Sequence, residues 1–243
     1  MSASKRKFKT FSEATCGRSD WLCHPDIKVE VLKHILSPES LPSEERGSIK
    51  ILVPGVGHST IAFELHSLGY DVTVCDLNAE QLSPENLLFP NILYFDLLDN
   101  IPTSLLEQYD YVIDSSVTDV FMQMTSAKVP QISTAKQVHS RLHSTLKKNG
   151  IMVVFSMNRN PWKKIYRHFK ERIFKYLVIR PTFNVTTKRG RSTSRTGDDV
   201  LVLVSAPPDT ELVLRDVPNE VEGASIIDTW SNEVPDDWQG ARD

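Results

Sequence analysis

Two glycines and three aspartates stand at the ends of short apolar runs, where a chain can place polar groups around a ligand. Gly55 and Gly57 follow the run KILVP at 50–54, and Asp76 ends the run VTVCD. Asp96 follows NILYF, and Asp114 ends DYVID. Glycine lets another group approach the main chain closely, and a carboxylate offers paired oxygens to hydroxyl groups. These residue types favour the binding of a nucleotide-like ligand.

The order of the predicted elements explains how these residues would meet. Strands are predicted at 50–54, 72–76, 91–95, 110–114 and 151–156, and helices at 24–36, 59–68, 78–87 and 131–147, with Ser59 as a cap. Alternating strands and helices specify a mostly parallel sheet covered on both faces, which binds ligands beyond the carboxyl ends of its strands. We therefore expect the glycines and the three aspartates at one edge of the sheet.

The pattern changes after residue 160. Segment 161–177 has aromatic and aliphatic residues at helical spacing with lysines and arginines between them, which predicts a helix whose aromatic side chains pack in the core. Two β-like runs, 181–188 and 199–206, predict a hairpin. The sequence between them, RGRSTSRTGD, predicts a mobile basic tip.

Length and composition indicate one main domain. The chain has 243 residues, of which 40% are hydrophobic, enough for one substantial core. We divide it into an N-terminal helical or lid segment, 1–48, a ligand-binding domain, 49–206, and an acidic tail, 207–243, predicted to be partly disordered. No apolar stretch approaches the roughly 20 residues that cross a bilayer, and the N-terminus lacks the apolar centre of a signal peptide. We expect a cytoplasmic monomer.

The cysteines indicate neither a disulfide framework nor a metal site. Cys16, Cys23 and Cys75 are few and scattered, in agreement with a reducing compartment. Cys16 and Cys23 with His24 lack both the short CxxC spacing and a fourth ligand, so we predict no metal site.

Charge is unevenly distributed along the chain, although the net charge is only −3. Residues 163–195 contain eleven lysines and arginines against one acidic residue, Glu171, whereas 207–243 contain ten acidic residues against two arginines. This pattern fits either an electropositive face with an acidic tail, or a solvated helix followed by a floppy terminus. A basic face would permit contact with nucleic acid.

The glycine loop and its aspartates resemble those of class I S-adenosylmethionine-dependent methyltransferases. The dinucleotide pattern GxGxxG is not met, because Thr60 occupies the third glycine position, which disfavours NAD. The stretch ILVPGVGHSTIAFELHSLGYDVTVCDLN is similar to the methyltransferase-like branch with a PGCGNS loop, whose members include protein-lysine methyltransferases of elongation factor 1-alpha. YDYVIDSSVTDVFM is similar to its FDxVIDKGTLDAL, and QVHSRLHSTLKKNGIMVVFS to its EVxRVLKPGGxFLLIS. The likeness covers residues 20 to about 160.

This resemblance, with the order of elements, implies a Rossmann-like, doubly wound, mostly parallel seven-stranded sheet with a C-terminal antiparallel hairpin. It also implies a set of S-adenosylmethionine contacts: Gly55, Val56 and Gly57 at the amino-acid part, Asp76 and Leu77 at the ribose, Asp96 with Phe95 or Leu97 at the adenine, and Asp114 beneath the sulfonium. Trp21 would help to close the pocket, and Ser115 would face the acceptor.

Each of these residues also has a purely structural interpretation. The glycines can form a tight turn, Asp76 can cap a helix, and Asp96 and Asp114 can form turns at strand ends. Two departures from the branch leave the acceptor open: its Lys-Gly pair is Ser115-Ser116 here, and its loop asparagine is His58.

Methyl transfer from a sulfonium needs alignment more than acid or base catalysis. Positioning can supply up to about 7–11 kcal/mol in favourable cases. An amine acceptor must still be neutral to attack, and we predict Asp114 and Asp119 as the catalytic carboxylates that orient it.

Four functions compete. The resemblance favours a protein N-methyltransferase acting on lysine. The lost Lys-Gly pair and three aromatic lid candidates favour a small-molecule methyltransferase: Trp21, Phe121 and Trp162. A non-catalytic scaffold is disfavoured, because Gly55, Gly57 and Asp76 are all retained. An RNA methyltransferase, suggested by 163–195, ranks last, because no NPPY-type motif follows Asp114.

Overall fold

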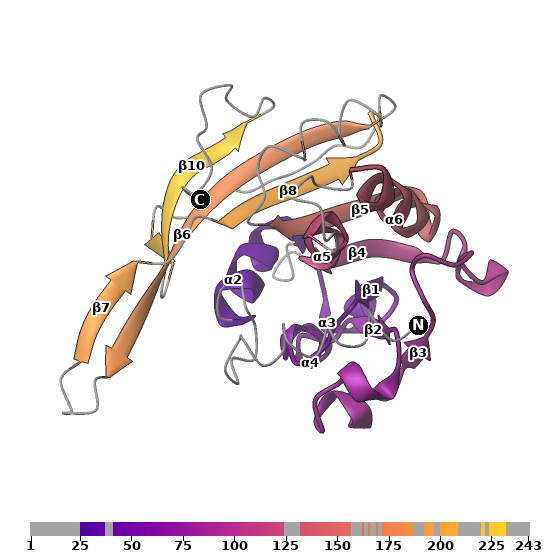
Figure 1. The fold of residues 1–243 in the computed structure, drawn as a ribbon, viewed down its shortest axis with the longest axis horizontal. Coiled ribbons are helices and arrows are strands. Elements are labelled where there is room, and N and C mark those ends of the chain that lie inside the picture. The colour runs from indigo at the N-terminus through magenta and orange to yellow at the C-terminus, as the bar shows by residue number, and fades with distance from the viewer. Residues whose placement is uncertain are drawn as a thin grey trace.

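The computed structural model of the chain describes residues 25–36, 41–123, 132–156, 162, 165, 169, 172–186, 192–196, 200–208, 220–221 and 224–231. Its centre is one mixed sheet in the order β3-β2-β1-β4-β5-β8-β6-β10-β9 (Figure 1). The strands are β1 (Lys50–Pro54), β2 (Asp71–Asp76), β3 (Ile92–Tyr94), β4 (Tyr109–Ser115), β5 (Leu146–Ser156), β6 (Ile173–Thr186), β8 (Val200–Ala206), β9 (Glu220–Val221) and β10 (Ala224–Ser231). A further strand, β7 (Ser192–Thr196), pairs with β6 outside this order.

The first seven positions of the sheet confirm the predicted fold class. β1 pairs in parallel with β2 and β4, β2 with β3, and β4 with β5. β8 enters antiparallel between β5 and β6, which confirms antiparallel strands on the C-terminal side of the sheet. The pairing differs from the predicted hairpin, because β8 pairs with Ile173–Ile179 and residues 182–186 pair with β7. Strand order reverses between β1 and β4, and a reversal of this kind leaves room for a ligand at the carboxyl ends of the strands.

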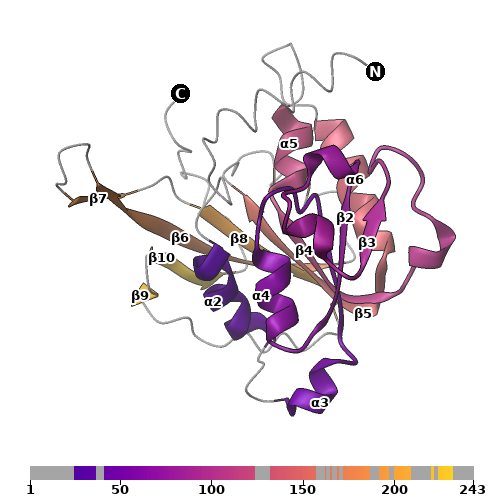
Figure 2. The same ribbon diagram turned by 90° about the horizontal axis from the view of Figure 1, so that it is seen from below.

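Helices cover both faces of the parallel half. The helices are α2 (Pro25–Leu36), α3 (Ser43–Arg46), α4 (Ile61–Ser67), α5 (Val117–Gln123) and α6 (Ile132–Ser144). α2 packs beside α4, and α5 beside α6 (Figure 2). The central strands alternate accordingly, since Ile51 and Val53 of β1 belong to the cluster of α2 and α4, whereas Leu52 belongs to that of α5 and α6. Within the described residues, no helix has the length and apolar character to cross a membrane.

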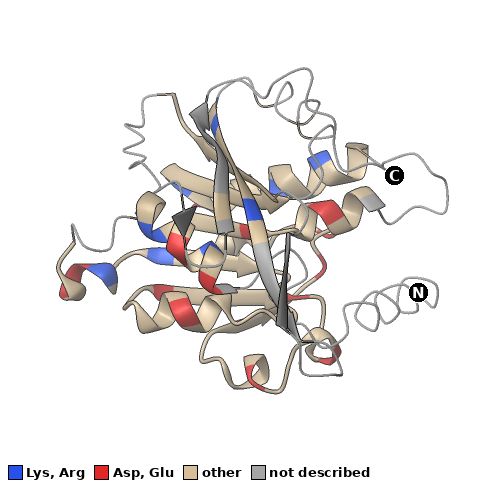
Figure 3. Cartoon of the chain, turned by 90° about the vertical axis from the view of Figure 1, so that its left-hand side faces the viewer, with Lys and Arg blue, Asp and Glu red and all other residues tan. Residues whose placement is uncertain are grey.

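Acidic and basic residues of the described chain are interspersed on the side that carries β6 and β10 (Figure 3). Within the basic segment 163–195, Arg172 is used inside the fold. Its guanidinium donates to the Ser205 Oγ at 2.9 Å and to the Gly150 carbonyl at 2.7 Å, and so joins the start of β6 to β8 and β5. At least this basic residue serves packing.

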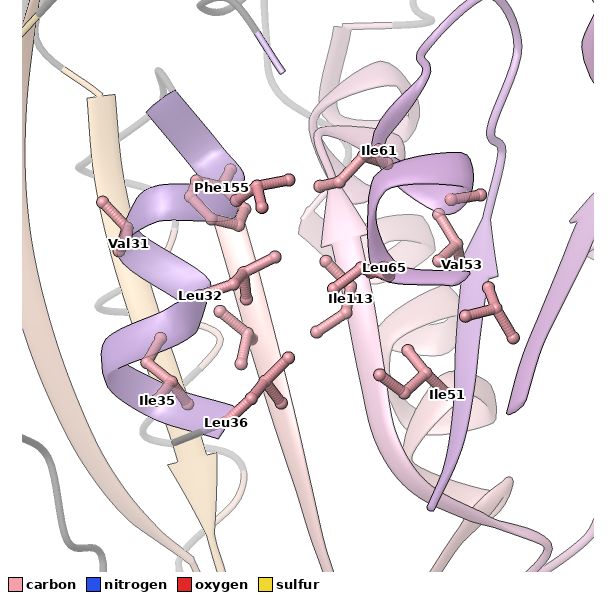
Figure 4. Close-up of a cluster of buried hydrophobic side chains, with 14 of the residues drawn as sticks. Val31, Leu32, Ile35, Leu36, Ile51, Val53, Ile61, Leu65, Ile113 and Phe155 are labelled. Atoms are coloured by element: carbon pink, nitrogen blue, oxygen red, sulfur yellow. The ribbon is translucent and has the colours of Figure 1, made fainter. Parts of the chain in front are cut away.

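α2 forms because its apolar residues recur on one face. Val31, Leu32, Ile35 and Leu36 point towards β5 and the neighbouring strands, as Figure 4 shows. Asp26 stands in the first turn and Lys33 and His34 in the last, which suits the helix dipole. The helix thereby fixes the side chains of its N-terminal turn over the carboxyl end of β5.

Several predicted elements differ in the structure. The helix predicted at 78–87 is two 3-10 turns, Ala79–Gln81 and Asn86–Leu88. The helix predicted to end at Lys147 ends at Ser144, because β5 starts at Leu146 and Lys147 forms an ion pair with Asp110 at 2.8 Å. Thr60 rather than Ser59 occupies the N-cap position of α4, and a short helix, α3, lies in the predicted linker.

The C-terminal region departs furthest from prediction. The helix predicted over 161–177 cannot continue past 172, because Ile173 to Ile179 pair with β8. Residues 192–196, placed in the mobile tip, form β7 against the outer half of β6, and this ribbon projects from the sheet (Figure 1). Within the predicted tail, β10 pairs with β6 and β9 pairs with β10.

Candidate functional site

The ends of β1 and β2 form the first half of the candidate site, which we call the β1–β2 rim: Gly55, Val56, Gly57, Asp76 and Leu77. The Asp76 carboxylate accepts hydrogen bonds from the Gly57 N–H at 2.9 Å and the Leu77 N–H at 2.7 Å. The Gly55 N–H donates to the Cys75 carbonyl at 2.7 Å. The loop after β1 is therefore fixed to the end of β2 by main-chain donors.

Burial sets the electrostatics of this rim. It raises the pKa of Asp76, while the hydrogen bonds from Gly57 and Leu77 and the nearby His58 act in the opposite direction. The residue as a whole is half-buried. A partly desolvated carboxylate already held by two N–H groups is suited to accept hydrogen bonds from ligand hydroxyls.

The two loop glycines are needed for different reasons. Both have left-handed backbones, with φ of +55° at Gly55 and +49° at Gly57. A Cβ at Gly55 would lie 2.2 Å from Cγ2 of Val117, whereas one at Gly57 would meet nothing nearer than the Gln81 carbonyl at 3.8 Å. Packing against α5 therefore excludes a side chain at Gly55, whereas Gly57 is favoured by its left-handed backbone and not by a close contact.

Asn86 supports the loop from outside the predicted site. Its buried side chain donates to the carbonyls of Gly57 at 2.8 Å and Ser59 at 3.0 Å. The Ser83 N–H also donates to the Gly57 carbonyl, at 3.1 Å. No periodic signal marks Asn86 in the sequence, since it lies in a short irregular turn.

Phe95 and Asp96 follow β3 on the same side of the sheet. The Phe95 N–H donates to the Asp76 carbonyl at 3.1 Å, so the two strand ends are adjacent. Asp96 accepts the Leu98 N–H at 2.8 Å, the turn-forming role weighed for it. Both side chains are half-buried, and Leu97 is buried.

The second half of the site, the β4–β5 rim, consists of Asp114, Ser115, Ser116, Asp119 and Ser156. Asp114 is 0% exposed and accepts the N–H groups of Val117 at 2.7 Å and Thr118 at 3.3 Å, together with the Thr118 hydroxyl. Its carboxylate thus caps the start of α5. Burial raises the pKa of Asp114 to about 6 against the effect of these hydrogen bonds.

Asp119 is also 0% exposed, and it fixes the end of β5. The Ser156 hydroxyl donates to Asp119 at 2.6 Å, and the Trp162 indole donates to the Ser156 oxygen at 2.8 Å. Trp162 and Phe121, considered as lid residues, belong to the buried core. The third lid candidate, Trp21, lies outside the described residues, as do Cys16, Cys23 and His24.

Lys28 is a residue of the site that sequence reasoning missed. Its side chain is 0% exposed, and its Nζ lies 2.6 Å from the Ser115 Oγ and 5.7 Å from the centre of the Phe155 ring. Its charge also lowers the pKa of Asp114. One signal was available, because Lys28 shares the apolar face of α2 with Leu32 at i+4.

Ser116 adopts a conformation that is unusual for serine. Its φ is +72°, and its buried hydroxyl donates to the Phe155 carbonyl at 3.0 Å. Left-handed backbone costs a residue with a Cβ about 1 kcal/mol or more. Ser116 occupies the position of the glycine in the branch's Lys-Gly pair, so this backbone agrees with that resemblance.

The structure thus brings the predicted residues to the carboxyl edge of one sheet, in two halves that meet where Val117 packs on Gly55. In the described residues, each aspartate singled out accepts a hydrogen bond. The arrangement offers main-chain and carboxylate groups to a ligand at β1–β2, and hydroxyls backed by an ammonium at β4–β5.

Comparisons with known proteins found distant structural likeness only. Neither protein-family models nor curated proteins gave a match. The chain is similar to a TehB-like SAM-dependent methyltransferase from Corynebacterium glutamicum, with 17% identity, TM-score 0.46 and coverage of 84% of this chain and 97% of that one. It is also similar to precorrin-6y C5,15-methyltransferase from Geobacter metallireducens, with 14% identity, TM-score 0.47 and coverage of 74% and 87%. A third, precorrin 8w decarboxylase from Methanobacterium thermoautotrophicum, shares 13% identity, with TM-score 0.44 and coverage of 67% and 84%. Likeness this distant does not identify an activity.

Proposed function

We propose that the protein is an S-adenosylmethionine-dependent methyltransferase. One observation carries the proposal: the Asp76 carboxylate is held by the N–H groups of Gly57 and Leu77 beside a glycine loop, next to the strand-order reversal. Paired hydroxyls of a ribose are donors that match a carboxylate in this position. The motif resemblance to class I methyltransferases supports the same cofactor.

The residues of the β1–β2 rim fit this cofactor. The amino-acid part would lie along the loop at Gly57, where a Cβ would meet no atom nearer than 3.8 Å, and Asp76 with Leu77 would hold the ribose. Half-buried Phe95 and Asp96 would flank the adenine from the end of β3. When bound, the cofactor supplies a methyl group already activated by its sulfonium. The chain then has to orient the acceptor and exclude water.

The acceptor is the finer part of the proposal. The branch resemblance favours the amine of a protein lysine, for which Asp114 and Asp119 were the predicted orienting groups. A small-molecule acceptor is the second candidate, and the buried Lys28 favours it, because an ammonium beside Ser115 repels a cationic acceptor. A cytoplasmic monomer would suit either acceptor.

Calorimetric titration with S-adenosylmethionine and S-adenosylhomocysteine tests the cofactor. Asp76→Ala should weaken both by about 10- to 100-fold, since hydrogen bonds to charged groups contribute roughly 1.5–3 kcal/mol. Asp71→Ala, at the opposite end of β2, is the matched control and should bind like the wild type. A wild type that binds neither ligand, or equal losses of affinity in the two variants, would refute the proposal.

A further inference from the structure

Lys28 and Ser115 form a hydrogen-bonded pair that leaves the Ser115 hydroxyl hydrogen available to another molecule. A lysine ammonium only donates hydrogen bonds, so in the 2.6 Å contact the Ser115 oxygen is the acceptor. The Ser115 hydroxyl proton must then be directed away from Lys28. Backed by a positive charge, this hydroxyl is a strong donor for an oxygen of another molecule.

The position of Ser115 makes it the accessible member of the pair. Ser115 is half-buried, whereas Lys28 is buried. Asp114 and Ser116, which flank Ser115 in the chain, are buried as well. Ser115 ends β4 and pairs with Phe155 of β5, at the edge where the acceptor would approach. Its side chain lies on the same face of the sheet as α2, which carries Lys28.

The carboxylates that could attract a cationic acceptor are committed inside the fold. Asp114 accepts hydrogen bonds from the N-terminus of α5, which lies on the opposite face of the sheet from Lys28. Asp119 accepts a hydrogen bond from the Ser156 hydroxyl. Among the residues that the structure describes, the β4–β5 rim therefore combines a cation and hydroxyls with carboxylates that already accept hydrogen bonds within the fold.

We infer that Lys28 and Ser115 form a subsite for an anionic group of the methyl acceptor, so that the acceptor is a carboxylate- or phosphate-bearing small molecule rather than a protein lysine. This inference rests on the proposed methyltransferase function and narrows its substrate class. Ser115 contacts the anionic oxygen, and Lys28 is the positioning residue that polarises Ser115.

The variants are chosen to keep the fold. Lys28→Met retains the apolar stem and removes the charge, Lys28→Arg retains the charge, and Ser115→Ala removes the donor. Lys33→Met is the matched control on α2, where Lys33 is 41% exposed and pairs with Glu30 at 2.9 Å. Thermal unfolding establishes that each variant is folded before it is assayed.

The first measurement is calorimetric binding of S-adenosylhomocysteine and of 5′-methylthioadenosine, which lacks the amino-acid carboxylate. Lys28→Met and Ser115→Ala should bind both within about twofold of the wild type. If Lys28→Met loses affinity for S-adenosylhomocysteine alone, the pair serves the cofactor's carboxylate and the inference is overturned. A wild type that binds neither would instead overturn the proposed function itself.

The second measurement is transfer of a tritiated methyl group from S-adenosylmethionine into extract of the source cells, separated into protein, RNA and small molecules. We expect label in small molecules retained by an anion exchanger. Lys28→Met should lower the label in these small molecules at least about tenfold, and Ser115→Ala should lower it too. Lys28→Arg should retain part of the methyl transfer, because it keeps the positive charge. Label in protein, RNA or unretained small molecules, no label from a cofactor-binding wild type, or full transfer by Lys28→Met would each overturn the inference.

Discussion

The two rims of the candidate site use the same residue types in opposite ways. At the β1–β2 rim, the half-buried Asp76 is held by main-chain N–H groups of Gly57, in the loop after β1, and of Leu77, its chain neighbour. At the β4–β5 rim, Asp114 and Asp119 are fully buried and bind α5 and Ser156. A carboxylate at a strand end is therefore a ligand candidate only where the following helix leaves it available.

Under the proposed function, this difference would separate cofactor binding from acceptor choice. The β1–β2 rim is built from residues close in sequence and from backbone donors, which suits an invariant ligand. The β4–β5 rim depends on side chains from α2 and α5, which can change the acceptor without disturbing the loop. The two rims meet at Gly55 and Val117, and the four predictions below test how far they are independent.

The largest effect is expected where the rims touch. Gly55→Ala should lower the free energy of unfolding by about 2–4 kcal/mol, because its Cβ would clash with Val117 and its backbone is left-handed. Gly57→Ala has only the backbone cost of about 1 kcal/mol. Urea unfolding measures both, and Val117→Ala should rescue part of the Gly55 loss. Equal losses at the two glycines would show that the contact does not join the rims.

Asp114 should make the β4–β5 rim sensitive to pH. Its pKa is raised to about 6 in the fold, so the stability linked to it is full below the ordinary value of 3.8 and is lost as pH rises through 6. Asp114→Asn cannot titrate and should gain about 2 kcal/mol relative to the wild type between pH 4 and 7. Urea unfolding at both pH values measures this, with Asp110→Asn as control. If the difference in the free energy of unfolding between Asp114→Asn and the wild type is the same at both pH values, the raised pKa of the buried Asp114 is contradicted.

Lowering the pH should have the opposite effect on stability at His139 of α6, which lies behind this rim. Burial and Arg172 lower the pKa of His139 from 6.5 to about 3, so its linked stability is full above pH 6.5 and falls progressively as pH drops towards 3. The wild type should lose about 2 kcal/mol relative to His139→Phe by pH 5. Exposed His66, changed to Phe, is the control. Urea unfolding that shows no such loss at pH 5 would refute the prediction.

The smallest effect is expected at Ser116. Ser116→Ala loses the hydrogen bond to the Phe155 carbonyl and keeps the left-handed backbone, which should cost about 1 kcal/mol. Ser116→Gly loses the same bond but relieves the backbone, so the two effects should nearly cancel. Thermal unfolding distinguishes them. Identical stability of the two variants would mean that the backbone at 116 is unstrained.

Sequence reasoning recovered the features whose signals are local. The alternation of strands and helices predicted the sheet and its ligand edge, and the spacing of Gly55, Gly57 and Asp76 predicted the β1–β2 rim. It failed where local pattern and pairing disagree. The helical spacing of aromatics in 161–177 did not decide the structure from Ile173 onwards, because that segment pairs with β8.

What the sequence by itself determined is the α/β architecture and the place of the glycine loop, because apolar periodicity and glycine conformation act over a few residues. Only the tertiary structure decided that Lys28 reaches Ser115, 87 residues away. It also decided that Val117 excludes a side chain at Gly55 and that α5 takes up Asp114. Such contacts depend on which helix packs on which face of the sheet, and close packing across the sheet edge is what gave each aspartate its separate role.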